Sequence, residues 1–367
     1  MLARGLQSGG VDGIGSYTRE LGHELLRTEN TEVLPVSFGF QTDGSFPLQN
    51  VIQLPRYLSM LATSGVGTLS FTGQRLLRQK INLFHATDHL VPRYRDIPVV
   101  ATLMDTIPLS NPEMIRTRFA WLKSRLWRHT GHWADKIITI SDYSKSDIVH
   151  YFGIPPERIN VIPLGVDNRY FEAIDIDFKT SIRKKLNLPE HFFLFVGTLQ
   201  PRKNLERLLD AHALLSKQLQ QEIPLVIVGR AGWGHERLMP RLTEPSARKR
   251  IIWLNYLGDL EVRALMQSAL AMMFVSLYEG FGLPVVEAFA SGLPVIASNT
   301  TSIPEVTGDA ALLVDPLDIG AISTTMQQLI DDAPLRQRMK IAGWQRAREM
   351  TWAKCAKQTC SVYSSLC

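Results

Sequence analysis

Two glutamates bracket a glycine turn in the second half of the chain. Glu279 and Glu287 lie in the stretch 277–292, LYEGFGLPVVEAFASG, which follows the apolar run 271–275. Pro284 predicts the start of a helix, because its fixed φ is helical and the first helical residue needs no N–H partner. Glu279 would then lie at a strand end and Glu287 one turn into the helix, where both could accept hydrogen bonds from a polyhydroxylated ligand.

The backbone of this turn predicts a second kind of contact. Glycine allows a ligand to approach the main chain, and N–H groups at a helix N-terminus favour phosphate or sugar hydroxyls. The residues with such N–H groups are Gly280, Phe281, Gly282 and Leu283. The alternative interpretation makes Glu279 a helix-capping acid and Glu287 a solvated helix residue.

A pair of cations follows the first apolar run of the same half. Arg202 and Lys203 lie in the stretch 197–204, GTLQPRKN, between a predicted strand and a predicted helix. Arginine can bind a phosphate through two parallel hydrogen bonds, so the pair suits a diphosphate leaving group. The alternative is a solvated surface pair.

Glycines near the N-terminus could form a further phosphate cradle. Gly13 and Gly15, with Gly9 and Gly10 upstream, precede an amphipathic helix predicted from about Ser16. A flexible turn without a ligand is the alternative. The apolar strand ahead of this loop is very short, which indicates that the first strand is clipped or that the start codon lies upstream.

Apolar runs alternate with helical segments along the whole chain, which favours parallel sheets covered on both faces. In the first half the predicted strands are 33–38, 83–86, 99–104, 137–140 and 161–163. In the second half they are 192–196, 225–228, 251–254, 271–275, 295–297 and 311–314, and the predicted helices are 205–216, 260–269 and 352–366. We therefore predict an α/β protein with two doubly wound domains.

Size and composition restrict the class of protein. The 367 residues favour two domains, and the three cysteines, Cys355, Cys360 and Cys367, read as reduced thiols. We expect a cytoplasmic enzyme, since the chain has no long apolar run and no signal peptide. Its net charge of +5 indicates an anionic partner.

Residues 114–128 predict a basic amphipathic helix with two tryptophans and no acid. Such a helix could lie on an anionic membrane leaflet, and we expect possible peripheral contact with the inner face of the cytoplasmic membrane. The alternative is a core-packed helix with a solvated basic face.

These motifs resemble the retaining GT-B glycosyltransferases, specifically glycosyltransferase family 4, over nearly the whole chain. The Glu-x7-Glu stretch and the Arg-Lys-Asn stretch carry the resemblance. It implies two Rossmann-like domains facing a central cleft: residues 1–168 for the acceptor, 169–345 for the nucleotide sugar, and 346–367 as a helix crossing back to the first domain.

The resemblance also implies roles for individual residues. Glu279 would contact the transferred sugar, Glu287 the nucleotide ribose, and Arg202 and Lys203 the diphosphate. Contacts with the donor would also come from Gly13, Gly15, Arg230, Tyr256, Leu257 and the turn residues 280–283. Segments 229–234 and 256–259 resemble the nucleotide-facing loops of the family.

The first half departs from the family at one position. Relatives have Thr-x-His-Asp where this chain has Thr102-Leu103-Met104-Asp105. Asp105 is assigned to the catalytic residues by resemblance, and the role of the missing histidine must be dispensable, absent, or supplied by His85 or His89.

The residues of these motifs are most similar to those of bacterial mannosyltransferases of surface-polysaccharide assembly. We therefore expect a retaining hexosyltransferase that uses GDP-mannose, a lipid-linked oligosaccharide acceptor, no metal, no other cofactor and no nucleic acid. Four alternatives remain open: a nicotinamide-dependent oxidoreductase, a sugar-nucleotide epimerase, a sugar phosphorylase, and a non-catalytic binding protein.

Overall fold

The computed structural model describes residues 1, 13–28, 31–38, 51–54, 77–88, 90–94, 96–114, 120–244 and 249–367, with the backbone alone at 120–123. Contacts divide the chain into two compact units: unit 1 is Met1–Gly165 with Thr351–Cys367, and unit 2 is Val166–Met350. Unit 1 thus includes the C-terminal helix. The assignment of acceptor to one unit and donor to the other stays a prediction.

A parallel sheet of six strands forms the centre of unit 2, in the order β12-β11-β10-β7-β8-β9. Its strands are β7 (Phe193–Val196), β8 (Leu225–Val228), β9 (Ile251–Leu254), β10 (Ala271–Phe274), β11 (Val295–Ser298) and β12 (Leu312–Val314). All residues of β8, β10 and β11 are buried. Burial on both faces explains why these strands are apolar throughout instead of alternating.

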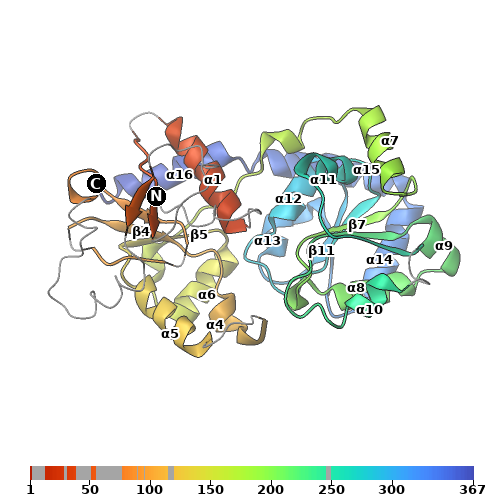
Figure 1. Cartoon of the computed structure of the whole chain (residues 1–367), viewed down its shortest axis with the longest axis horizontal. Coiled ribbons are helices and arrows are strands. Elements are labelled where there is room, and N and C mark those ends of the chain that lie inside the picture. Colours follow the sequence, from red (N-terminus) through yellow and green to blue (C-terminus); the bar gives the residue numbers. More distant parts are fainter. Residues whose placement is uncertain are drawn as a thin grey trace. The chain divides into compact units, whose positions relative to one another are not determined.

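Helices cover both faces of this sheet. Figure 1 shows α11 and α12 above β7 and β11, and α8, α10 and α14 below them. The helices of unit 2 are η4 (Asn168–Tyr170), α7 (Ile176–Lys185), η5 (Pro201–Lys203), α8 (Leu205–Ala213), α9 (Lys217–Glu222), α10 (Met239–Thr243), α11 (Asp259–Met266), α12 (Leu283–Ala290), α13 (Ile303–Thr307), η7 (Gly308–Ala310), α14 (Ile319–Asp331) and α15 (Ala333–Arg348).

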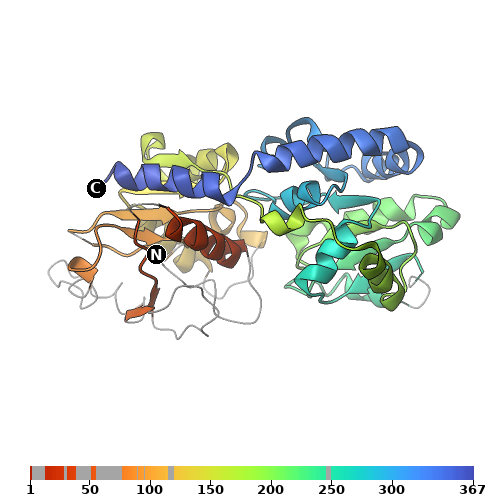
Figure 2. The same ribbon diagram turned by 90° about the horizontal axis from the view of Figure 1, so that it is seen from above.

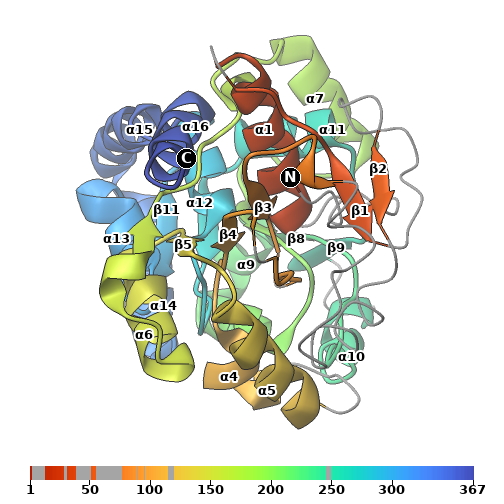
Figure 3. The same ribbon diagram turned by 90° about the vertical axis from the view of Figure 1, so that its left-hand side faces the viewer.

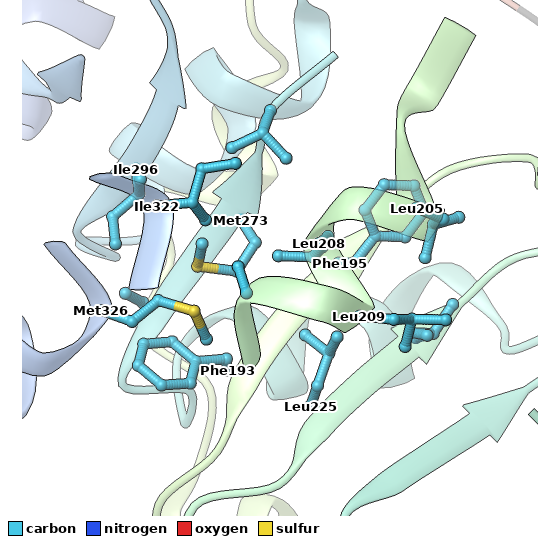
Figure 4. Close-up of a cluster of buried hydrophobic side chains, with 14 of the residues drawn as sticks. Phe193, Phe195, Leu205, Leu208, Leu209, Leu225, Met273, Ile296, Ile322 and Met326 are labelled. Carbon is cyan, nitrogen blue, oxygen red and sulfur yellow. The ribbon is translucent and has the colours of Figure 1, made fainter. Parts of the chain in front are cut away.

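Side chains from one face of the sheet and from two helices form the core of unit 2. Figure 4 shows Phe193, Leu225 and Met273 from the strands against Leu208 of α8 and Met326 of α14. These five side chains are fully buried. Burying a large apolar side chain stabilises the fold by about 1.5–3 kcal/mol, so this layer fixes the sheet on which the loops stand.

Unit 1 contains a second parallel sheet, in the order β3-β4-β5-β6, and a separate pair, β1-β2. The strands are β1 (Val36–Phe38), β2 (Ile52–Leu54), β3 (Phe84–Ala86), β4 (Val99–Thr102), β5 (Lys136–Thr139) and β6 (Ile159–Val161). Figure 3 shows α1 on one side of β3 and β4 and the helices α4, α5 and α6 on the other. The predicted α/β class with two doubly wound parts is confirmed.

The helices of unit 1 include the C-terminal helix, which packs along the first helix. Over the part of unit 1 that the structure describes, they are α1 (Gly13–Leu26), α4 (Ile107–Ser110), η2 (Pro112–Met114), α5 (Ala120–Gly131), α6 (Asp142–Phe152), η3 (Pro156–Arg158) and α16 (Trp352–Ser364). Figure 2 shows α16 beside α1, and their contact includes Tyr17 and Trp352, whose ring centroids are 6.2 Å apart.

Several predicted element boundaries differ from the structure by a few residues. The helix after Gly282 begins at Leu283, so that Pro284 is its second residue. The first described helix begins at Gly13, ahead of the predicted Ser16. The strand predicted at 161–163 is Ile159–Val161, because the preceding Pro-Glu-Arg turn leads directly into the ladder with β5.

The predicted basic helix lies partly outside the described residues. The structure places a helix at Ala120–Gly131, and residues 115–119 are not described. Among the described residues, the helices are all too short or too polar to cross a membrane.

The close approach of two loops in unit 2 gives a stability prediction. A Cβ on Gly229 would lie 1.9 Å from the carbonyl oxygen of Gly197, whereas a Cβ on Gly292 would meet nothing within 4 Å, and both glycines have positive φ. We expect Gly229→Ala to lower the free energy of unfolding by about 3 kcal/mol or more, and Gly292→Ala by about 1 kcal/mol. Urea denaturation measures both, and equal losses would contradict the predicted backbone clash.

A buried ion cluster in unit 2

Three charged side chains meet at the carboxyl edge of the unit 2 sheet. Lys203 Nζ lies 2.6 Å from Glu279 Oε1, and an Arg202 guanidinium nitrogen lies 2.8 Å from Glu279 Oε2. The side chains of Lys203 and Glu279 are less than one-tenth exposed, and Arg202 is about one-fifth exposed. We call this group the ion cluster.

The ion cluster carries an excess of positive charge. Burial raises the pKa of Glu279, but Lys203 and Arg202 outweigh burial and hold that pKa below its ordinary value. Burial lowers the pKa of Lys203, Glu279 opposes this, and Arg202 adds to it. Two cations facing one carboxylate leave an unbalanced positive charge, which a bound anion would neutralise.

Sheet topology explains why these residues meet. Strands β8 and β9 follow β7 on one side, and β10 lies on the other side, so the strand order reverses between β7 and β10. Arg202 and Lys203 follow β7, and Glu279 follows β10. In open parallel sheets, ligands bind at such a reversal, beyond the carboxyl ends of the strands.

Hydrogen bonds tie the two loops of the ion cluster together. Leu277 N donates to Arg202 O at 2.7 Å, and the Arg202 side chain donates to Tyr278 O at 3.2 Å. Asn204, buried and left-handed with φ of 58°, donates from its amide to Val275 O and to Pro316 O. The sequence alone predicts no role for Asn204, because its partners are far away in the sequence.

The loop after β11 holds the backbone of Glu279. Glu279 N donates to Thr301 Oγ1 at 3.3 Å, and Ser302 Oγ donates to Glu279 O at 2.8 Å. Ser302 is the N-cap residue of α13, but its hydroxyl makes no capping hydrogen bond to that helix. Thr301 has φ of 57°, a strained value for a β-branched residue. This strained conformation thus occurs in the loop that binds the backbone of Glu279.

The turn between the glutamates is buried and closely packed. Gly280, Phe281 and Gly282 are buried and Leu283 is half-buried. Gly282 has φ of 102°, and a Cβ there would lie 2.8 Å from Ile303 Cδ1. The first turn of α12 therefore begins at the carboxyl edge of the sheet beside Glu279. The ligand contacts predicted for these four residues stay predictions.

Glu287 lies in an environment opposite to that of Glu279. Burial raises the pKa of Glu287 to about 7, with Asp259 and Asp167 adding to the rise, while Tyr170 and Arg169 oppose it. Tyr170 and Arg169 both belong to the short helix η4, which packs against α12. The sequence carried no signal for this packing, because the two helices are far apart in the chain.

The loops after β8 and β9 complete the edge. The Arg230 guanidinium lies 4.5 Å from the centroid of the Tyr256 ring, which is 63% exposed. Leu199 N donates to Arg230 O, and Gly232 N donates to Leu199 O, so the loop after β7 is joined to the loop after β8. Leu257 is half-buried. A flat, exposed ring with a stacked guanidinium is suited to stack on a planar base.

The predicted residues of unit 1 lie on separate elements. Gly13 and Gly15 lie in the first turn of α1, and the glycine-rich stretch before them is outside the described residues. Asp105 follows β4 and accepts a hydrogen bond from Ile107 N at 3.2 Å, which stabilises the start of α4. Met104 O accepts a hydrogen bond from Ser144 Oγ.

His85 is a structural residue, so the suggestion that it replaces the histidine missing at Met104 is wrong. Its two ring nitrogens lie 2.7 Å from Tyr363 Oη and 2.8 Å from Thr102 Oγ1, and Tyr17 Oη lies 2.9 Å from the same Thr102 oxygen. Burial lowers the pKa of His85 to about 3, so the ring stays neutral. His89 is outside the described residues.

The described residues contain no group of three or more His, Cys, Asp or Glu side chains arranged to hold a metal ion. Whether the enzyme acts without a metal stays a proposal.

Comparisons of the sequence identify its relatives. Residues 178–346 match the family Glycosyl transferases group 1, and residues 11–170 match Glycosyltransferase Family 4. O-antigen chain mannosyltransferase B of Escherichia coli is 33% identical over 285 residues, which are 77% of this chain and 72% of that protein. Serotype-specific mannosyltransferase WbdA of Escherichia coli is 31% identical over 227 residues, 61% of this chain but 28% of that protein.

Solved structures share the fold over nearly the whole chain. Sucrose-phosphate synthase from Thermosynechococcus elongatus aligns with a TM-score of 0.74 at 20% identity, covering 97% of this chain and 94% of that chain. Anabaena HepE in complex with UDP aligns with a TM-score of 0.75 at 18% identity, covering 98% of each chain.

The two parallel-sheet units have the GT-B fold of these solved structures. The chain belongs to glycosyltransferase family 4, and its enzyme class is that of a hexosyltransferase.

The raised pKa of Glu287 predicts a pH-dependent stability. The folded protein keeps this proton up to pH about 7, whereas the unfolded chain releases it near pH 4.5. The wild type should therefore lose stability relative to Glu287→Gln as the pH rises from 4.5 through 7, by at most about 3 kcal/mol. Urea denaturation between pH 5 and 8 measures the difference.

The exposed Glu190 supplies the control for this measurement. Glu190→Gln removes an exposed carboxylate. The difference in unfolding free energy between this variant and the wild type should therefore vary less with pH over the same range. The raised pKa of Glu287 would be contradicted if the difference in unfolding free energy between Glu287→Gln and the wild type stayed constant with pH. It would also be contradicted if the wild type became more stable than the variant as the pH rose.

Proposed function

We propose that the enzyme transfers mannose from GDP-mannose to a saccharide acceptor, with retention of configuration at the anomeric carbon. The observation that carries this proposal is the ion cluster: a buried carboxylate between two cations at the strand-order reversal of unit 2. Relatives named as mannosyltransferases supply the choice of sugar.

The chemistry follows from the charge of the ion cluster. When the sugar leaves its nucleotide, negative charge grows on the diphosphate, and Arg202 and Lys203 are held where they can neutralise it. Donors that are already in place stabilise such charge without reorganisation. The first turn of α12 adds its helix dipole. Glu279, released in part from its cations by the phosphates, would accept hydrogen bonds from sugar hydroxyls.

Retention fits a site that needs no protein base. In the proposed step the acceptor oxygen forms its bond to the anomeric carbon on the face from which the diphosphate departs. The departing phosphate oxygen takes the acceptor proton, so the new glycosidic bond and the protonated leaving group balance the reaction. A methionine at position 104 is compatible with this step, since no imidazole takes part in it.

The nucleotide is assigned to the loops of β8, β9 and α12. The Tyr256 ring and the Arg230 guanidinium offer a stacking surface for the base, and Glu287 offers acceptors to the ribose hydroxyls. The neighbouring fold of Anabaena HepE is solved with UDP and with UDP-glucose, which supports a nucleotide-sugar site in this fold.

Donor binding tests the proposal directly. Isothermal titration with GDP-, UDP-, TDP- and ADP-sugars should single out GDP-mannose, and Lys203→Ala should weaken its binding by at least about tenfold, because a hydrogen bond to a charged group is lost. Arg202→Gln is a second variant, less buried and less disruptive to folding. Lys217→Ala, an exposed lysine of the same unit, is the control.

The same preparation distinguishes the rival reactions. Incubation with GDP-mannose and a mannosyl acceptor in EDTA should give a product whose anomeric configuration, measured by NMR, equals that of the donor. Interconversion of the donor without acceptor would indicate an epimerase, and binding without turnover would indicate a non-catalytic protein. Failure of every nucleotide sugar to bind would overturn the proposal.

We also propose that the acceptor is linked to a lipid, which places the enzyme at an anionic membrane surface. Arg125, Arg128 and His129 are exposed on α5, together with Leu126. Vesicles containing about 30% anionic lipid should sediment the enzyme at low salt and release it at high salt. Replacing Arg125 and Arg128 by glutamine should reduce binding, while Lys184→Gln should not. Equal sedimentation of all variants would contradict this surface.

A further inference from the structure

The loop after β11 binds both main-chain groups of Glu279. Thr301 Oγ1 accepts a hydrogen bond from Glu279 N at 3.3 Å, and Ser302 Oγ donates to Glu279 O at 2.8 Å. Thr301 Oγ1 itself donates to Thr300 O at 2.7 Å, so this hydroxyl both donates and accepts. We call Thr301 and Ser302 the hydroxyl clamp. Two adjacent side chains thus bind the peptide groups on either side of the Glu279 Cα.

Thr301 has a backbone conformation that most L-residues avoid. Its φ is 57°, a left-handed value that is especially unfavourable for a residue branched at Cβ. Glycine would adopt this conformation without strain, but glycine has no hydroxyl. The chain therefore keeps a strained side chain at a position where glycine would suit the backbone better. Strain of this kind clusters at functional sites.

Packing holds the hydroxyl clamp against the glycine turn that follows Glu279. Ser302 and Ile303 are fully buried. A Cβ on Gly282 would lie 2.8 Å from Ile303 Cδ1, so the loop after β11 and the turn 280–282 are in close contact. Interiors packed this closely leave little freedom for one loop to move relative to the other. The position of the clamp therefore determines the position of the Glu279 backbone.

The side chain of Glu279 is held by contacts of a different kind. Its carboxylate lies 2.6 Å from Lys203 Nζ and 2.8 Å from a guanidinium nitrogen of Arg202. In the proposed function a diphosphate binds both cations and competes with Glu279 for them. The ionic contacts of Glu279 then weaken at the stage at which it must contact the sugar. The hydrogen bonds to its main chain are not exposed to this competition, because the hydroxyls that form them are uncharged.

We propose that Thr301 and Ser302 are positioning residues for glycosyl transfer, which keep the Glu279 carboxylate directed at the transferred sugar while the diphosphate binds the two cations. This inference rests on the proposed function, which assigns the sugar to Glu279 and the diphosphate to Arg202 and Lys203. A small misplacement of a group that contacts the reacting sugar lowers the rate more than it lowers binding. Loss of the clamp should therefore reduce turnover and leave the binding of free GDP unchanged.

Three substitutions at position 301 separate the hydroxyl from the backbone conformation. Thr301→Val keeps the branched shape without the hydroxyl, Thr301→Gly removes the hydroxyl and the strain, and Thr301→Ser keeps the hydroxyl. We would follow the release of GDP from GDP-mannose with octyl α-mannoside as acceptor, and the Kd of GDP by titration calorimetry. The kcat should fall by about tenfold or more in the valine and glycine variants and by less than about threefold in the serine variant. The Kd of GDP should stay within about twofold of the wild-type value in all three.

Stability distinguishes a positioning role from a merely structural one. Because glycine adopts this φ without strain, Thr301→Gly should unfold at a temperature about 2 °C or more above that of Thr301→Val. If the hydroxyl positions Glu279, the two variants should be equally slow in spite of this difference. If the hydroxyl only stabilises the loop, kcat should recover together with stability. A wild-type kcat in Thr301→Gly would overturn the inference, and this variant alone decides the matter if Thr301→Val does not fold.

Three further variants serve as comparisons. Thr307→Val is the matched control, because Thr307 is fully buried and its hydroxyl donates to Ile303 O within α13 at 2.9 Å. This substitution removes a buried hydroxyl from the same region and should leave kcat unchanged. Ser302→Ala should lower kcat and keep the Kd of GDP, as Thr301→Gly does. Lys203→Ala should instead raise the Kd of GDP, because it removes a cation assigned to the diphosphate.

The outcomes separate this inference from the proposed function. If the wild type binds GDP and releases it from GDP-mannose, but Thr301→Gly and Ser302→Ala do the same at the wild-type rate, the proposed function stands and the hydroxyl clamp has no positioning role. If these two variants lose GDP binding as strongly as they lose turnover, the clamp supports the nucleotide and not the sugar, which also overturns the inference. If the wild type neither binds GDP nor releases it, the proposed function is wrong and the inference falls with it.

Discussion

The ion pairs of Glu279 with Lys203 and Arg202 are the interaction on which the arrangement of unit 2 depends. Removing two charges from water costs several kcal/mol for each, and an excellent geometry is needed to offset that cost. The contacts of 2.6 and 2.8 Å supply this geometry. A buried pair of this kind is a poor source of stability in itself, so its position at the strand-order reversal is better explained by function than by folding.

The surrounding backbone is built to keep the ion cluster in place. Asn204 joins the loop after β7 to the ends of β10 and β12, and Thr301 and Ser302 join the loop after β11 to Glu279. Two of these residues, Asn204 and Thr301, have positive φ without being glycine. Non-glycine residues keep such conformations where the surrounding structure forces them to. Here the two strained residues lie in the loops that position the Glu279 carboxylate.

Local features of the sequence predicted the fold and singled out the three residues of the ion cluster, because each feature is encoded within a few residues, but they did not predict the ion pairs among these residues. A run of buried apolar residues marks a parallel strand, and a Gly-x-Pro turn marks the helix that follows it. Glu279, Arg202 and Lys203 were found because the carboxyl ends of parallel strands share one edge. The roles of Ser302 and His85 could not be predicted in this way. Each depends on a partner in a distant element, as in the contact of His85 with Tyr363, and such pairing follows from tertiary packing alone.

The two glutamates of the motif share one stretch of sequence but have opposite proton affinities. Glu279 is buried between two cations, so its pKa falls, whereas Glu287 is half-buried, and partial burial together with Asp259 and Asp167 raises its pKa to about 7. Environment, and not residue type, separates the roles that such paired carboxylates can take. The lowered pKa of Glu279 keeps its carboxylate ionised near neutral pH, where it serves as a fixed charge. Glu287 changes its charge near neutral pH, so in the proposed function the affinity for the nucleotide would vary with pH in a range where the charge of Glu279 is constant.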